Sequence, residues 1–422
     1  MKKALLLFTS LSLLFAFSLP AMADGHCMDA LGCVEVGSDD PIVIGALLTV
    51  SGATSFYGED SRGGIEIAID ARDGMLLGRE IELVVEDSLC SAEGGQATAQ
   101  RAAADESIVG LIGTTCSGAA QGAMPIISEA GMLMISPSNT SPRLTNDDVD
   151  AGGTYYPGYF RTAHNDLFQG AMGARFAIEV LGAETVATIH DGDPYTEGLA
   201  VVMADTFAEM GGEVVFQGAV AKGDTDMTAI LTEIAASGPD VVYFPVFTPE
   251  SEFIATQARN TPGLEDAKLI VSDGSFSSTF AGNVGAAAVG IHMTSPYVVG
   301  EDYDGFLMTW DDMFGGAPPS GFHAHAYDAA NILMDAVEMV AEEHDGSLMI
   351  GRQALRDAIA AVEDYAGLTG TLTCQDESPY RGDCATGSAL AVYEITEAEV
   401  DGAWPPAVVW DMSMSMDMMD EG

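Results

Sequence analysis

The chain has 422 residues, of which 64 are acidic and 15 are basic, so that its formal net charge at pH 7 is −49. So large an acid excess repels nucleic acids and anionic membrane surfaces, and neither is an expected partner. The length, about 400 residues without a leader, exceeds what one hydrophobic core usually serves and favours two lobes.

The first residues have the pattern of a secretory signal peptide. Lys2 and Lys3 precede an apolar run over 4–19, and Ala21-Met22-Ala23 has the small-x-small pattern of a signal-peptidase site. The run is shorter than the roughly 20 residues that a membrane-spanning helix needs. No later stretch is apolar enough to span a bilayer. We therefore expect cleavage after Ala23 and a soluble protein exported to the periplasm.

From Pro41 the sequence alternates short β-rich runs with helical segments. The rhythm restarts after Thr162. Such alternation is typical of a parallel, doubly wound sheet, because parallel neighbours need crossover connections. In the first series the expected strands are 42–48, 81–86, 108–112 and 132–136, and the expected helices are 57–73, 93–105 and 117–130. In the second series the expected helices are 166–181, 195–210, 227–236 and 249–259, and the expected strands are 185–190, 213–217, 240–245 and 268–272.

The pattern changes again around residues 291–296. Long helices at 321–343 and 352–362 are expected to return to the first lobe, and strands at 369–373 and 389–395 to lie on the second. The predicted fold class is therefore α/β, with two doubly wound parallel-sheet lobes joined by a hinge that permits closure around a ligand. The expected parts are a signal peptide (1–23), an N-terminal extension (24–40), a first lobe (41–162 plus 295–368), a second lobe (163–294 plus 369–410) and a disordered tail (411–422).

Six cysteines in an exported chain indicate disulfide bonds. Zinc is the alternative, but the sequence has no C-x-x-C pair and no cluster of cysteine and histidine. We therefore expect neither a metal nor another cofactor. Spacing favours pairing Cys27 with Cys33, Cys90 with Cys116, and Cys374 with Cys384.

Signatures of catalysis are missing. The chain has no G-x-S-x-G elbow, no phosphate-binding loop of the G-x-x-x-x-G-K-[ST] type and no H-E-x-x-H helix. Asp191-x-Asp193 begins like a calcium loop, but Tyr195 and Thr196 stand where a ligand and a glycine belong. We therefore expect no enzyme, and a hydrolase that uses His190 with Asp191 is the alternative.

Polar residues follow the ends of two expected strands of the first lobe. In open parallel sheets, ligands bind outside the carboxyl ends of the strands. Ser117 is expected to cap the helix that it opens, and a helix start offers free N–H groups to a carboxylate. Ser138, Asn139 and Thr140 follow the next strand, where hydroxyls can donate to a carboxylate and carbonyls can accept from an ammonium group. The competing interpretation is that Ser117 only caps its helix.

The second lobe offers a negative charge for the same ligand. Asp273 follows the expected strand 268–272. A bound zwitterion needs partners for both of its charges, because an unpaired buried charge is costly. Alone, Asp273 also suits an ordinary turn. The aromatic residues expected to wall the pocket are Tyr57, Tyr195, Phe247 and Tyr327.

Several segments resemble the periplasmic leucine/isoleucine/valine-binding proteins of branched-chain amino acid transporters. The likeness covers nearly all of the mature chain and depends on the order and spacing of the segments. It implies a type I periplasmic binding fold that captures a small amino acid, branched-chain in the first place, by hinge closure. It also implies that the protein, as a monomer, delivers the amino acid to the permease of an ABC transporter in the inner membrane. The segments are Ile44-Gly45-Ala46, Ser51-Gly52, Tyr57-Gly58, Glu86-Asp87-Ser88-Leu89-Cys90, Cys116-Ser117, 134–142, His190-Asp191 and Tyr195-Thr196-Glu197-Gly198.

The resemblance also assigns roles to single residues. The cysteine bridge of the family falls on Cys90 and Cys116. The carboxylate donors fall on Ser117 and Thr140, and the ammonium acceptors on the Ser138 carbonyl, Thr140 and Asp273. The aromatic positions fall on Tyr57, Tyr195 and Phe247, with Tyr327 a weaker match.

Two positions depart from the family pattern. Asp273 stands where close relatives carry glutamate, and Phe247 stands where a tyrosine is expected. The acidic anchor is thus one methylene shorter, and one hydroxyl is missing. The alternatives that stay open are the same fold with an amide, urea or a small aromatic carboxylate as ligand, or a ligand-sensing module.

Overall fold

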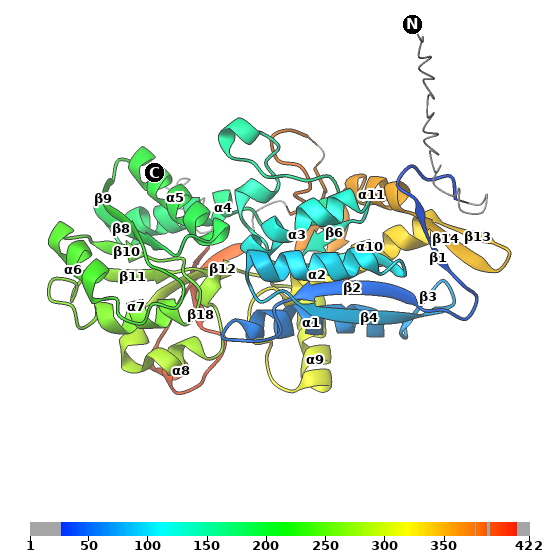
Figure 1. Cartoon of the computed structure of the whole chain (residues 1–422). Coiled ribbons are helices and arrows are strands. Elements are labelled where there is room, and N and C mark those ends of the chain that lie inside the picture. Colours follow the sequence, from blue (N-terminus) through cyan, green and yellow to red (C-terminus); the bar gives the residue numbers. More distant parts are fainter. Residues whose placement is uncertain (1–26, 376, 386–388, 412–422) are drawn as a thin grey trace, which may run out of the picture.

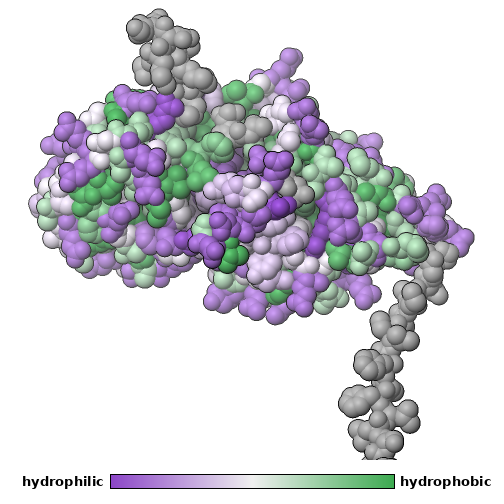
Figure 2. Space-filling model, turned by 90° about the horizontal axis from the view of Figure 1, so that it is seen from above, coloured by the Kyte–Doolittle hydropathy of each residue, from purple (hydrophilic) through white to green (hydrophobic). Residues whose placement is uncertain are grey.

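The computed structural model describes residues 27–375, 377–385 and 389–411. The expected signal peptide and residues 412–422 of the expected tail lie outside these ranges. Two α/β lobes lie side by side along the long axis of the molecule (Figure 1). Seen from above, hydrophilic side chains are spread over both lobes among smaller apolar patches (Figure 2). In the described part of the chain, no helix has the length and apolar character needed to cross a membrane.

The first lobe is built on a six-stranded sheet in the order β3-β4-β2-β5-β6-β7. The central strand β2 is buried along its whole length, and its side chains alternate between two cores. Ile44 belongs to the core that contains α10, and Val43 to the core that contains α2 and α3. All pairings are parallel except that of β3 with β4. The strands are β2 (Ile42–Leu48), β3 (Met75–Leu76), β4 (Arg79–Asp87), β5 (Ile108–Gly113), β6 (Met134–Ser136) and β7 (Tyr159–Arg161), and the helices are α1 (Ser55–Asp70), α2 (Ala92–Ala104), α3 (Ser117–Glu129), α9 (Glu301–Phe314), α10 (His323–Val340) and α11 (Arg352–Ala360).

The N-terminal extension packs on the first lobe. Strand β1 (Cys33–Val36) pairs antiparallel with β14 (Ser347–Gly351), which in turn pairs with β13 (Ala341–His344). Val34 and Val36 are buried in the core of that lobe. Because β13 pairs with β14, helix α10 ends at Val340, and the expected helix over 321–343 is too long at this end.

The second lobe has a seven-stranded sheet in the order β18-β17-β12-β11-β10-β8-β9. The strands from β12 to β9 are parallel, as expected, but β17 and β18 join the edge antiparallel, so the sheet is mixed. The strands are β8 (Thr185–His190), β9 (Glu213–Ala219), β10 (Val241–Tyr243), β11 (Lys268–Val271), β12 (His292–Pro296), β17 (Leu390–Glu394) and β18 (Ala407–Asp411), and the helices are α4 (Asp166–Arg175), α5 (Pro194–Glu209), α6 (Thr228–Ser237), α7 (Glu250–Ala258), α8 (Phe280–Val284) and α12 (Glu397–Val400).

The loop closed by Cys374 and Cys384 lies on the first lobe, whereas the sequence analysis placed it on the second. Both cysteines belong to the core of the first lobe. Arg161, at the end of β7, is fully buried and pairs with Asp383 of this loop at 2.5 Å. A short hairpin of β15 (Tyr365–Gly367) and β16 (Gly370–Leu372) precedes the loop. The chain therefore enters the second lobe only with β17. The disulfide bonds join Cys27 to Cys33, Cys90 to Cys116, and Cys374 to Cys384, the pairs that spacing favours.

Candidate functional site

A cavity lies between the lobes, beyond the carboxyl ends of the strands. Its volume is only about 10 Å³, so the two lobes are closed upon each other. The first lobe contributes Tyr57, Thr115, Cys116, Ser117, Ser138 and Phe322, and the second lobe contributes Tyr195, Phe247 and Asp273.

The start of α3 forms one end of this cavity. Cys116, and not Ser117 as expected, holds the N-cap position: its backbone is extended, with φ −107° and ψ 140°, and Ser117 is the first helical residue. The Ser117 hydroxyl accepts the Ser141 N–H at 3.3 Å. The N–H groups of Ala119 and Ala120 already donate to the Cys116 carbonyl. No described residue accepts the N–H groups of Ser117 and Gly118, and together with the helix dipole these attract an anion. The Cys90–Cys116 disulfide ties this helix start to the loop after β4.

The loop after β6 supports the same wall. The Ser138 hydroxyl donates to the Thr115 carbonyl at 2.9 Å, which joins the two loops that end β5 and β6. Asn139 and Thr140 are buried but do not line the cavity. The Asn139 side-chain oxygen accepts the Tyr159 hydroxyl at 3.3 Å, and the Thr140 carbonyl accepts the Asp166 N–H at 3.0 Å. These two residues therefore lie behind the residues that line the cavity.

Asp273 lines the cavity from the second lobe, in a 3₁₀ turn that follows β11. Its Oδ1 accepts the Gln169 amide at 2.5 Å and the Tyr195 hydroxyl at 2.9 Å. No hydrogen bond from a described residue reaches its Oδ2. Burial raises the pKa of Asp273 to about 6, although the bonds from Gln169 and Tyr195 act in the opposite direction. Among the described residues that line the cavity Asp273 is the only carboxylate, so it offers a negative charge to a ligand.

A buried network of hydrogen bonds through Gln169 fixes the position of the Asp273 carboxylate. Gln169 also donates to the Thr294 carbonyl at 3.0 Å, and its side-chain oxygen contacts His164 Nε2 at 2.6 Å. Burial lowers the pKa of His164 to about 4, so the ring is neutral at pH 7 and donates this bond. Burial, and then the charge of Asp273, raise the pKa of the nearby Asp166 well above its usual value. The sequence did not predict Gln169 or His164, because nothing local marks Gln169 as the partner of Asp273, 104 positions away, or His164 as the residue that holds Gln169.

Aromatic rings close the sides of the cavity. The Phe247 ring lies 5.1 Å from that of Tyr195 and, edge-on, 6.2 Å from that of Tyr57. Phe322, which the sequence analysis did not select, lies 6.4 Å from Tyr57. Tyr327 lies elsewhere: its ring packs on Phe306 at 5.4 Å, in a separate apolar cluster.

Direct contacts across the cleft accompany this closure. The Ser141 hydroxyl donates to the Pro194 carbonyl at 3.0 Å. Arg143 and Glu197 form an ion pair at 3.3 Å, but both side chains are exposed, so the pair adds little stability. The Tyr57 hydroxyl donates to the Asp273 carbonyl.

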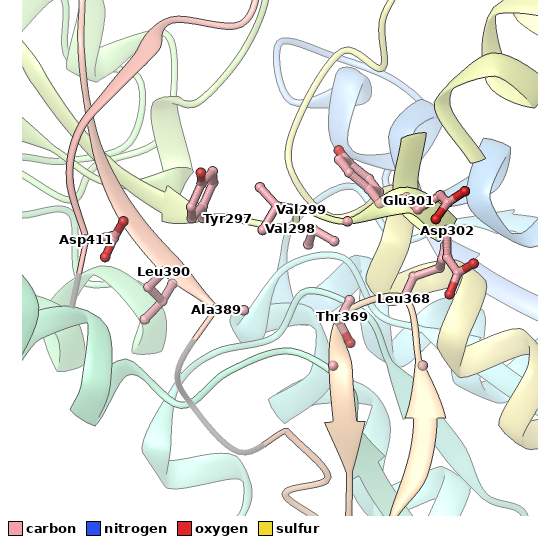
Figure 3. A pocket seen from close by; sticks show the side chains of 14 residues that line it. Tyr297, Val298, Val299, Glu301, Asp302, Leu368, Thr369, Ala389, Leu390 and Asp411 are labelled. Carbon is pink, nitrogen blue, oxygen red and sulfur yellow. The ribbon is translucent and has the colours of Figure 1, made fainter. Parts of the chain in front are cut away.

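A larger cavity of about 440 Å³ lies at the hinge, where segments pass between the lobes (Figure 3). Tyr297 and Leu390 lie on the side of the second lobe, and Leu368 and Thr369 on that of the first. None of the residues that the sequence analysis selected for ligand binding lines it. Within the described ranges, no group of three or more His, Cys, Asp or Glu side chains is arranged to hold a metal ion.

Comparison with known proteins agrees with this geometry. The model of a periplasmic binding protein family matches residues 41–397. A leucine-, isoleucine-, valine-, threonine- and alanine-binding protein from Pseudomonas aeruginosa is 30% identical over 307 residues, which cover 72% of this chain and 79% of the relative. The Leu/Ile/Val-binding protein of Escherichia coli is 30% identical over 270 residues, which cover 63% of this chain and 71% of the relative.

Solved structures share the fold. A leucine-binding protein from Thermotoga maritima has a TM-score of 0.74 and 25% identity, with 88% of this chain and 99% of that chain covered. An ABC transporter solute-binding protein from R. palustris, solved with benzoate, has a TM-score of 0.69 and 22% identity, with 84% of this chain and 93% of that chain covered. Because the family model matches most of this chain, the chain belongs to the periplasmic binding protein family, in the branched-chain amino acid-binding group.

Proposed function

We propose that this protein captures a small amino acid, with branched-chain side chains preferred, and presents it to an ABC transporter. The observation that carries the proposal is the pairing of two complementary ends in one cavity. The start of α3 suits the α-carboxylate, and the Asp273 carboxylate suits the ammonium group. The aromatic rings between them suit an apolar side chain. As a member of a binding-protein family, the chain is not an enzyme.

Closure is the step that selects the ligand. An amino acid enters the cavity of about 10 Å³ when the lobes part, and the lobes then close around it with the cavity walls displaced by the volume of the ligand. A ligand then shifts the equilibrium between open and closed forms only through contacts that the closed form improves. Tyr195, Phe247 and Asp273 lie on the second lobe and meet a ligand held on the first. They should therefore govern closure.

The location and the partner belong to the same proposal. The signal-peptide pattern at 1–23 supports export to the periplasm. The relatives that bind leucine, isoleucine and valine support a permease in the inner membrane as the partner that receives the ligand. Purified protein that restores leucine uptake by vesicles containing the cognate permease would support this role.

An aromatic carboxylate is the second candidate, because a structural neighbour binds benzoate. The buried Asp273 disfavours it, since benzoate has no ammonium group to offset a second carboxylate. Isothermal titration of the Asp273→Asn variant separates the two candidates. An amino acid should lose most of its affinity, whereas benzoate should bind better. The matched control is Asp205→Asn, an exposed position on the same lobe. Full affinity of Asp273→Asn for leucine would contradict the proposal.

A further inference from the structure

We propose a second ligand pocket between the lobes, which takes a small neutral aromatic molecule and is coupled to the amino acid site. Its volume is about 220 Å³. An apolar protein cavity of about 150 Å³ is enough to bind benzene. The pocket is thus large enough for a one- or two-ring molecule, whichever amino acid the main cavity takes.

Aromatic side chains dominate the walls. The Phe276 ring lies 4.8 Å from Trp404 and 4.7 Å from Tyr393. Tyr297 meets Tyr393 edge-on at 6.4 Å. Among the described residues that line the pocket there is no Asp, Glu, Lys or Arg, and its His323 is already bonded to Tyr303 and Asp60. Tilted rings of this kind offer faces and edges against which another aromatic ring packs favourably.

Most polar side chains of the walls are already hydrogen-bonded. The Trp404 indole donates to the Pro318 carbonyl, and the Tyr393 hydroxyl to the Pro296 carbonyl, both at 2.7 Å. Tyr303 and His323 bond to each other, also at 2.7 Å. A ligand therefore meets few groups that seek a hydrogen bond, which favours a neutral molecule with little polarity.

The two pockets share walls. Residues 273–276 present Asp273 to the main cavity and Phe276 to the second pocket. In the segment 320–323, Phe322 lines the main cavity, and Ser320, Gly321 and His323 line the second pocket. The buried carboxylate of Asp60 fixes this segment, since it accepts the N–H groups of residues 320 and 322 at 3.0 and 2.8 Å. A displacement of either segment in one cavity therefore changes the shape of the other cavity, because packed interiors transmit displacement.

The pocket also exists only while the lobes keep this arrangement. Phe276 and Trp404 come from the second lobe, and Leu307 and Pro318 from the first. The Trp404–Pro318 bond crosses between the lobes, as does the bond from the Ser320 hydroxyl to the Phe276 carbonyl at 2.8 Å. A molecule that binds here stabilises the closed form. By reciprocity, the amino acid and the aromatic molecule each raise the affinity of the other.

Indole is a suitable probe for this pocket. Isothermal titration and ligand-observed NMR on the purified mature protein should show binding of one indole per chain, tightened roughly tenfold by saturating leucine. Leu307→Trp fills the pocket and should abolish indole binding but keep leucine binding. Met308→Trp, the next residue on α9 and 72% exposed, should bind indole like the wild type.

A second pair of variants tests the same pocket independently, in case Leu307→Trp does not fold. Val408→Phe fills the pocket from β18, and Val409→Phe places the same ring at its exposed neighbour. Indole binding that survives both filling variants would overturn the proposal. So would competition between indole and leucine for one site, or binding of tetramethylammonium in preference to indole.

Discussion

The Tyr57 hydroxyl of the first lobe donates a hydrogen bond to the backbone carbonyl of Asp273 in the second lobe. Helix α1 is thereby joined to the turn that carries the acidic end of the cavity. The bond forms only when the cleft is closed, because its donor and acceptor belong to different lobes. It couples closure to the position of the group that we expect to meet the ammonium of the ligand.

Replacing Tyr57 by phenylalanine should weaken ligand binding modestly. The Asp273 carbonyl also accepts the Phe276 N–H at 2.8 Å and so stays paired after the change. The loss is then that of one hydrogen bond, about 0.5–1.5 kcal/mol, or about 2- to 12-fold in affinity. Isothermal titration measures the affinity, and small-angle scattering should show a more open unliganded protein. Affinity equal to that of the wild type would contradict a role of this bond in closure.

Amino acid binding should weaken in acid because of Asp273. Its pKa is raised to about 6 by burial, and an ammonium group needs the ionised form. Affinity should be level above pH 7 and fall about tenfold per pH unit below 6. The Asp273→Asn variant should bind weakly at every pH and lack this step. A wild-type profile that stays flat down to pH 5 would exclude Asp273 as the anchor.

The raised pKa of Asp273 also affects the stability of the unliganded protein, but this stability should increase in acid, whereas ligand affinity should decrease. The folded protein binds the proton of Asp273 more tightly than the unfolded chain, in which the pKa is near 3.8. The stabilisation from this group is therefore complete below pH 3.8 and is lost as the pH rises through 6, by about 3 kcal/mol. Urea unfolding of wild type and Asp273→Asn between pH 4 and 7 should show a difference with this slope. The reverse slope would be incompatible with a raised pKa.

Gly118 should be intolerant of a side chain in the closed form. A Cβ atom there would lie 2.5 Å from Oδ2 of Asp193, which belongs to the other lobe. Asp193 cannot easily retreat, because it caps α5 and pairs with Lys222 at 3.0 Å. Gly118→Ala should fold normally but cost the closed form about 1–3 kcal/mol, or about 5- to 150-fold in ligand affinity.

The control for this change is Gly305→Ala on α9, where an added Cβ meets nothing within 4 Å. It should leave the affinity, measured by titration calorimetry, unchanged. If both variants bind alike, the close approach of Gly118 and Asp193 has no part in closure.

The Cys90–Cys116 disulfide should stabilise the first lobe. It closes a loop with a sequence separation of 26 residues, for which the chain-entropy argument gives about 3.5 kcal/mol. The Cys90→Ser/Cys116→Ser double variant should lose this amount in urea unfolding. The Cys27→Ser/Cys33→Ser variant, with a separation of 6, should lose less, about 2 kcal/mol. An equal loss in both would argue against loop size as the cause.

Long apolar runs made much of the fold predictable from the sequence. Strand β2 begins and ends where its β-rich run predicts, and β8 does the same. Helix α9 was missed, because it is rich in acidic residues, contains a glycine and buries only Phe306 and Trp310. The course of residues 369–385 depended on the buried pair of Arg161 and Asp383, which local pattern does not reveal.

The candidate site was predictable where chemistry is local. Ser117, Ser138 and Asp273 follow strand ends, and the structure brings them to one cavity. Tyr327 was predicted to line the pocket and Phe322 was not, because the start of α10 was misplaced. Since the helix starts two residues later than expected, Phe322 stands just before it and faces the cavity. The bond of Gln169 to Asp273 arises only from the packing of the second lobe.

The most direct test of the central claim is isothermal titration of leucine into mature protein that has been unfolded and refolded to remove any bound ligand. We expect saturable binding of one leucine per chain at pH 7, slightly weaker binding of isoleucine and valine, and loss of most of the leucine affinity in Asp273→Asn. No binding of these amino acids, together with binding of benzoate or acetamide, would contradict it.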